Sequence, residues 1–105
     1  MKFPVLPLLI ASLVWAGCAT NKYETLAPLP TPAMAEKSGQ PLSTLEQGRI
    51  VFLAQCGRCH EHQFPDTANT RDWHVVVPGM AWNAGISKSD EKAVLAYVLA
   101  AKVKK

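Results

Sequence analysis

The sequence has few cysteines and lacks several patterns that would point to common protein classes. Its three cysteines, Cys18, Cys56 and Cys59, are too few for a framework of several disulfides. It has no internal repeat, so a solenoid or propeller is not expected. Eleven Lys and Arg stand against eight Asp and Glu without forming a basic stripe, so we expect no nucleic-acid partner. No catalytic acid–base pair or activated nucleophile is recognisable, so we do not expect an enzyme.

The longest apolar run is also short. It extends from Phe3 to Ala16, whereas a membrane-spanning helix needs about 20 apolar residues, and it contains Pro4 and Pro7. Lys2 precedes the run and small residues follow it, which is typical of a cleaved secretory signal peptide. We therefore predict export, with the cysteine chemistry of an oxidising compartment.

The end of this run, Val14-Trp15-Ala16-Gly17-Cys18, resembles a bacterial lipoprotein signal. The resemblance implies that residues 1–17 are removed and that Cys18 carries the lipid, which anchors the protein on the periplasmic side of a membrane. Ala19 after the cysteine favours the outer membrane if the cell is Gram-negative. The alternative is ordinary signal cleavage after Ala19.

Residues 18–41 are rich in proline and small polar side chains. Pro28, Pro30, Pro32 and Pro41 disfavour a helix or a central strand, and no apolar periodicity is present. We predict a semi-rigid, extended tether, with a disordered segment as the alternative. The remaining residues, 42–105, form one domain of about 64 residues, a size that usually needs a covalent or metal staple.

The motif that carries chemistry is Cys56-x-x-Cys59-His60. In an exported chain, this spacing is typical of haem c attachment, because two thiols three positions apart can form thioethers to one porphyrin and the next histidine can bind the iron. Three alternatives remain open: a thioredoxin-like dithiol, a disulfide, and a zinc site that also uses His62.

Two helices are predicted around this motif. Ser43 and Glu46 form a capping box for a helix that ends near Ala54. Gly48 inside it is plausible where another backbone crosses closely. Ser87 and Asp90 begin a second helix, whose buried face is expected to contain Val94, Tyr97, Val98 and Ala101.

The pattern Gly48-x-x-x-Phe52-x-x-x-Cys56-x-x-Cys59-His60, followed by a last helix with Tyr97, resembles class I cytochromes c. The resemblance implies an all-α, cytochrome c-like fold of three to four short helices around one covalent haem c. It also implies that the first and last helices cross near Gly48 and that Phe52 packs against Tyr97. His60 would be the proximal iron ligand.

The second axial ligand is sought further along the chain. Trp73 and Met80, seven positions apart, resemble a subset of small cytochrome domains, which implies that Met80 is the distal ligand and Trp73 lies near the haem propionates. We expect a short helix at 71–77 and a turn at Pro78-Gly79 that aims Met80 inward. Met80 could instead fill the core, with His74 as the second candidate ligand.

Other residues have smaller expected roles. His62 is too close to the proximal ligand to reach the other side of the ring and should be a solvated rim residue, and Met34 lies in the tether. A carbonyl near Pro65 should accept the second ring N–H of His60. Arg58 should face solvent and Trp82 should cover the distal side. A solvated helix end is expected at Lys102, Lys104 and Lys105.

The resulting functional hypothesis is a single-electron carrier that exchanges electrons with redox partner proteins and has a relatively positive potential, because thioether ligation favours ferrous iron. One alternative is a haem protein with an open or weakly held sixth position that binds small gases or peroxide. Others are an electron-transfer subunit of a larger oxidoreductase and a metal or dithiol module without haem.

Overall fold

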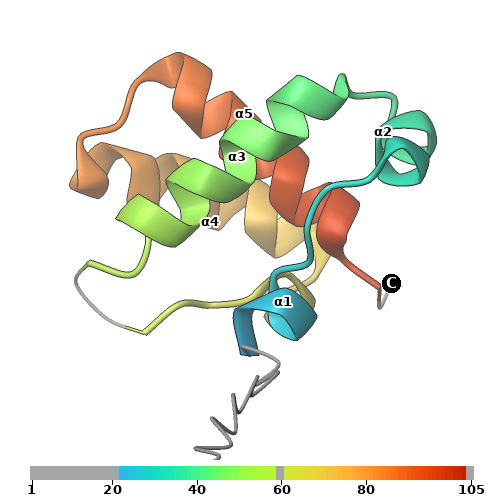
Figure 1. Cartoon of the computed structure of the whole chain (residues 1–105). Helices are drawn as coiled ribbons and strands as arrows, with labels where there is room; N and C mark the ends of the chain where they lie inside the picture. Colours follow the sequence, from blue (N-terminus) through green and yellow to red (C-terminus); the bar gives the residue numbers. More distant parts are fainter. Residues whose placement is uncertain (1–21, 59–60, 104–105) are drawn as a thin grey trace, which may run out of the picture.

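The computed structural model describes residues 22–58 and 61–103, and within them every regular element is a helix (Figure 1). This confirms the predicted all-α class. Cys18, Cys59, His60, Lys104, Lys105 and the signal peptide lie outside the described residues. In chain order, the helices are α1 (Lys22–Leu26), α2 (Pro32–Ser38), α3 (Leu42–Gln55), the 3-10 helix η1 (Pro65–Thr67), α4 (Thr70–Ala84) and α5 (Lys88–Ala101).

The centre of the fold is the crossing of α3 over α5 (Figure 1). A Cβ atom added to Gly48 on α3 would meet the Ala93 carbonyl oxygen, and it would lie 2.6 Å from the Ala93 carbonyl carbon and 2.7 Å from Tyr97 Cβ. The Phe52 and Tyr97 rings meet beside this point, with centroids 5.9 Å apart and planes tilted by 49°. The predicted crossing at Gly48 and the aromatic contact are both confirmed.

The ends of α3 and α5 differ in how well local sequence predicts them. Ser87 caps α5 by accepting the Asp90 N–H at 3.1 Å, as predicted. The predicted capping box at Ser43 is wrong, because α3 begins at Leu42 and its cap residue, Pro41, makes no side-chain hydrogen bond. The Pro41 carbonyl accepts the first helical N–H groups instead, which places Ser43 inside the first turn.

The prediction that residues 18–41 contain no helix is also wrong. Pro32 lies in the first turn of α2, where its missing N–H is not needed. Thr31 caps this helix by accepting the Met34 N–H at 3.2 Å. Gly39 ends it at φ 71°, a left-handed conformation that glycine adopts without strain.

The segment that contains α1 and α2, residues 22–41, is here called the N-terminal strap. Ala27 is fully buried in the core, and its carbonyl accepts Arg49 Nε at 2.9 Å. The Tyr97 hydroxyl donates to the Pro28 carbonyl at 2.8 Å, and Met34 packs against the core from α2. These contacts make the strap part of the folded unit instead of an extended tether.

The buried face predicted for α5 is confirmed, because Val94, Tyr97, Val98 and Ala101 are all buried.

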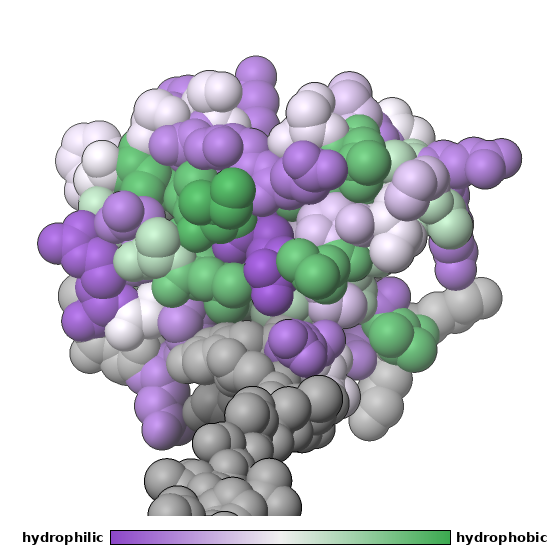
Figure 2. Space-filling view, in the orientation of Figure 1, coloured by the Kyte–Doolittle hydropathy of each residue, from purple (hydrophilic) through white to green (hydrophobic). Residues whose placement is uncertain are grey.

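On the face drawn in Figure 2, hydrophobic side chains form separate patches that polar side chains interrupt. None of the described helices has both the length and the apolar character needed to cross a membrane.

Candidate functional site

Helix α4 forms one wall of the candidate site, and it is longer than predicted. Asn69 caps it by accepting the Asp72 N–H at 2.8 Å, and it continues through Pro78 to Ala84. The predicted helix end at Val77 and turn at Pro78-Gly79 are therefore wrong. Pro78 removes the helical hydrogen bond to the His74 carbonyl. Both residues are exposed, so water can satisfy that carbonyl.

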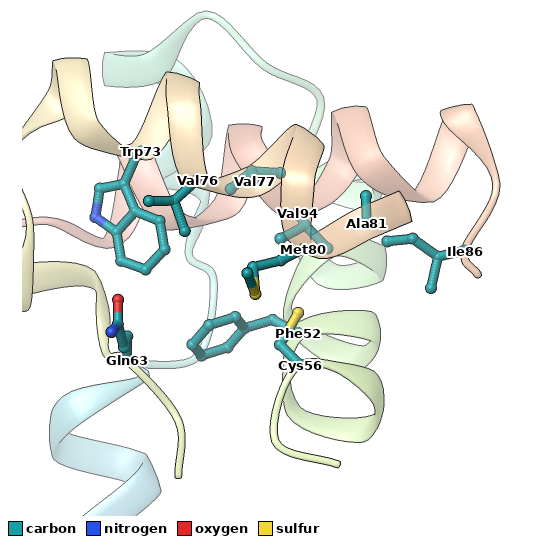
Figure 3. Close-up of a pocket in the computed structure, with 10 residues that line it drawn as sticks. All are labelled: Phe52, Cys56, Gln63, Trp73, Val76, Val77, Met80, Ala81, Ile86 and Val94. Carbon is teal, nitrogen blue, oxygen red and sulfur yellow. The ribbon is translucent and has the colours of Figure 1, made fainter. Parts of the chain in front are cut away.

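The position of Met80 follows from its place on one face of α4, and not from a turn. Trp73, Val77 and Met80 are four and then three positions apart, so they share one face of α4. Trp73 and Val77 are buried on that face, while Met80 is 39% exposed. Figure 3 shows the Met80 thioether extending from α4 toward the side chains at the end of α3.

The opposite wall is the C-terminal end of α3. Cys56 is the residue that ends this helix, and its N–H donates to the Phe52 carbonyl at 3.2 Å. The Phe52 ring and the Cys56 thiol face the same space as Met80 (Figure 3). This space is a cavity of about 180 Å³, lined by Phe52, Cys56, Gln63, Trp73, Val76, Val77, Met80, Ala81, Ile86 and Val94.

The cavity is apolar, and two sulfur-containing side chains, Cys56 and Met80, line it. None of its described lining residues carries a charged side chain, and Gln63 is the one amide among them. Burial raises the pKa of the Cys56 thiol above its ordinary value, since the thiolate would be poorly solvated there. Cys56 is therefore a neutral thiol in the apolar wall near neutral pH. Gln63 and Met80 are exposed, so the cavity opens to solvent beside them.

Trp73 is held in place by the 3-10 helix η1. Its indole Nε1 donates to the Pro65 carbonyl at 2.9 Å, and both residues are buried. Lys102 Nζ also lies 3.5 Å from the Pro65 carbonyl oxygen and donates to the Ala68 carbonyl. Lys102 is thus half-buried against this loop, and the prediction that it is a solvated helix end is wrong. Pro65 carries a different contact from the one predicted, and its role toward His60 stays a prediction because His60 lies outside the described residues.

The remaining candidates lie away from the cavity wall. His74 is exposed on α4, as expected for a surface histidine, and Arg58 is exposed and donates to the Gln55 amide oxygen at 3.0 Å. Trp82 is 86% exposed and does not line the cavity, so the described structure does not support the expectation that it covers the distal side. His62 is half-buried instead of solvated, with its ring between Phe52 and Phe64.

Several lining residues were not predicted from the sequence. Val76, Val77 and Ala81 lie three, four and eight positions after Trp73, which is the spacing of one helix face. This signal is visible in the sequence once the helix is allowed to continue through Pro78. Gln63 and Ile86 come from loops, and no local pattern identifies them as site residues.

The residues that line the cavity fit a haem in chemical kind. A haem needs apolar walls on both faces, a cysteine at one edge and a soft ligand inside, which match Phe52, Trp73, Cys56 and Met80. An engineered apolar cavity of about 150 Å³ accepts benzene, so the 180 Å³ here has room for one small ring and not for a whole haem. The remainder of the haem would have to occupy the side that opens to solvent.

Among residues 22–58 and 61–103, no group of three or more His, Cys, Asp or Glu side chains could hold a metal ion. The zinc alternative requires Cys59 and His60, which lie outside these ranges. Comparison with protein-family models, curated proteins and solved structures finds nothing that matches the chain.

Proposed function

We propose that this chain is a small c-type cytochrome that carries single electrons on one covalent haem. The haem would be attached through Cys56 and Cys59, with His60 as the proximal and Met80 as the distal iron ligand. The observation that carries the proposal is that Met80 on α4 and Cys56 at the end of α3 face one apolar cavity. Cys56 is the first residue of the Cys-x-x-Cys-His motif.

Each described residue has a role that follows from its position. When bound, the haem would supply a one-electron ferric–ferrous couple. Phe52, Trp73 and Val77 are buried and form the apolar wall of the cavity. A thioether inside an apolar cavity favours the less charged ferrous state, so we expect a relatively positive potential. The η1 loop fixes the Trp73 ring through the Pro65 carbonyl.

The proposal includes export and anchoring. The lipoprotein-like signal that ends at Cys18 would place the protein on a periplasmic membrane surface, with the outer membrane favoured if the cell is Gram-negative. Its partners would be redox proteins that exchange electrons with it. The cytochrome c-like arrangement of helices is part of this proposal, and the contact of α3 with α5 at Gly48 supports it.

The experiment compares two methionines. The full chain is produced together with haem-attachment machinery, and haem staining after denaturing electrophoresis tests covalent attachment. In the oxidised protein, Met80→Ala should abolish the sulfur-to-iron charge-transfer absorption. Met34→Ala removes a thioether from α2, where it packs away from the cavity, and should leave that absorption intact. An unchanged band in Met80→Ala would refute the ligand assignment, and no haem staining in the wild type would refute the function.

A second function is favoured by the exposure of Met80, which is 39%. If the thioether bond to iron is weak or absent, the protein would bind small gases or peroxide at the sixth position. Carbon monoxide titration of the reduced protein separates the two functions. A carrier with a firm Met80 bond should resist carbon monoxide until Met80→Ala removes the ligand, whereas an open site should bind it equally with or without the substitution.

A further inference from the structure

The His62 ring is fixed at the end of α3. Its Nε2 lies 3.1 Å from the Phe52 carbonyl oxygen and 3.2 Å from the Leu53 carbonyl oxygen. Both partners are acceptors, so Nε2 carries the hydrogen. The Phe52 carbonyl also accepts the Cys56 N–H. The Leu53 carbonyl lies in the last turn of α3, where carbonyl groups have few partners within the helix itself, so the His62 ring supplies part of the C-terminal cap of α3.

Aromatic contacts prevent the ring from turning away. Its centroid lies 5.3 Å from that of Phe52 in a tilted contact and 5.9 Å from that of Phe64 in a stacked contact. Phe52 belongs to α3, while Phe64 follows His62 on the segment that leads to η1. The ring thus joins the chain that enters the Cys-x-x-Cys-His loop to the chain that leaves it.

Gly57 meets this ring face-on. A Cβ atom at Gly57 would lie 2.7 Å from His62 Nδ1 and 2.8 Å from His62 Nε2, closer than real Cβ atoms approach other atoms. Because two carbonyl groups and two aromatic rings hold the imidazole, it cannot move aside cheaply. The residue after Cys56 must therefore lack a side chain as long as His62 keeps this position.

We infer that His62 is a positioning residue for the haem-attachment loop and that Gly57 is its required counterpart. This inference rests on the proposed function. The pair fixes both ends of the loop between positions 57 and 62, which lowers the conformational entropy lost when the loop presents its two thiols and His60 to one porphyrin. The hydrogen bonds to the Phe52 and Leu53 carbonyl groups occupy Nε2, so this nitrogen is not available as an iron ligand in this position.

The test is a double-substitution cycle in the full chain, produced together with haem-attachment machinery. Gly57→Ala, His62→Ala and the double variant are compared with the wild type for haem per protein and for Tm. We expect Gly57→Ala alone to attach haem several-fold less and to lose about 5 °C in Tm. His62→Ala should also attach less haem, and His62→Gln, which keeps an N–H donor, should recover part of it.

The decisive result is the double variant. Because His62→Ala removes the ring that the new Cβ would strike, the double variant should lose no more than His62→Ala alone. Losses that simply add would overturn the inference, as would wild-type attachment in His62→Ala. Val98→Ala, a core change on α5 away from the loop, should lower Tm without altering haem attachment or the His60-dependent visible spectrum.

The two proposals fail in different ways. Wild-type protein without covalent haem would refute the proposed function, and the cycle in Tm on the purified full chain would then decide the His62–Gly57 contact by itself. Haem attached to the wild type with additive losses in the cycle would overturn only the role of His62.

Discussion

At the scale of single residues, Gly48 makes the most demanding contact in the fold. Its Cα faces the Ala93 carbonyl, and a Cβ there would lie 2.6 Å from the Ala93 carbonyl carbon. This neighbour is backbone, so it cannot rotate away as a side chain would. Relief requires α3 and α5 to separate, which would disturb the Phe52–Tyr97 contact beside them.

We therefore expect Gly48→Ala to lower the free energy of unfolding by about 3 kcal/mol or more, measured by urea denaturation of the purified full chain. Gly79 is the matched control, since it lies inside α4 and a Cβ there would meet no atom within 4 Å. Gly79→Ala should raise stability by about 0.5–1 kcal/mol. Equal effects at the two glycines would contradict the close helix crossing.

The residues at the crossing of α3 and α5 could be predicted because their contacts depend on their spacing along the sequence. Gly48, Phe52 and Tyr97 were identified from a sequence pattern, and the structure brings them together as expected. His62 could not be identified in that way. Its partners, Gly57 and the carbonyl groups of Phe52 and Leu53, come together only after the chain reverses at the end of α3.

At the scale of elements, the N-terminal strap depends on the Tyr97 hydroxyl. That hydroxyl donates to the Pro28 carbonyl at 2.8 Å, and the pKa of Tyr97 is raised to about 12 by burial, against the opposing effect of the neighbouring Arg49 guanidinium. The unfolded pKa is about 10. A raised folded pKa stabilises the fold fully below pH 10, and this contribution is lost as pH rises from about 10 to about 12.

We expect Tyr97→Phe to lower stability by about 1 kcal/mol at neutral pH, because one partly buried hydrogen bond is lost. Above pH 10, wild-type stability should fall more steeply than that of the variant, which has no hydroxyl to ionise at this position. Urea denaturation at pH 7 and at steps from pH 9 to 12 measures both effects. If the two proteins lost the same stability above pH 10, ionisation of Tyr97 would not weaken the contact with the strap.

Prolines account for the wrong predictions at α4 and in the strap. Local sequence predicts that a proline ends or excludes a helix, yet Pro32 occupies the first turn of α2 and Pro78 lies inside α4. An interior proline costs about 3 kcal/mol in an isolated helix. Burial of Trp73 and Val77 on the core-facing side of α4 offsets this, and such packing is not visible in local sequence. The cap at Ser87 needs no tertiary contact and was predicted correctly.

At the scale of the whole molecule, the strap would shorten the distance between the folded unit and the lipid that the proposed function places on Cys18. A free tether from Cys18 to Leu42 could extend by about 80 Å, at about 3.3 Å per residue. The strap is already buried at Ala27, which leaves nine residue steps after Cys18 and an extension of at most about 30 Å. The fold therefore limits how far the folded unit can lie from a lipid on Cys18, whereas the composition of residues 18–41 alone indicated an extended spacer.

We predict that the lipidated protein lies close to its membrane. Neutron reflectometry on a supported bilayer should place the nearest part of the protein layer within about 30 Å of the headgroups. An insert of about 12 Gly and Ser residues between Asn21 and Lys22 should thicken the gap by up to about 20 Å, while Cys18→Ser should remove the protein from the bilayer. A wild-type gap already as wide as that of the insert variant would mean that the strap detaches from Tyr97 and Arg49 at the membrane. The contacts of Ala27 and Pro28 would then hold only in the unanchored protein.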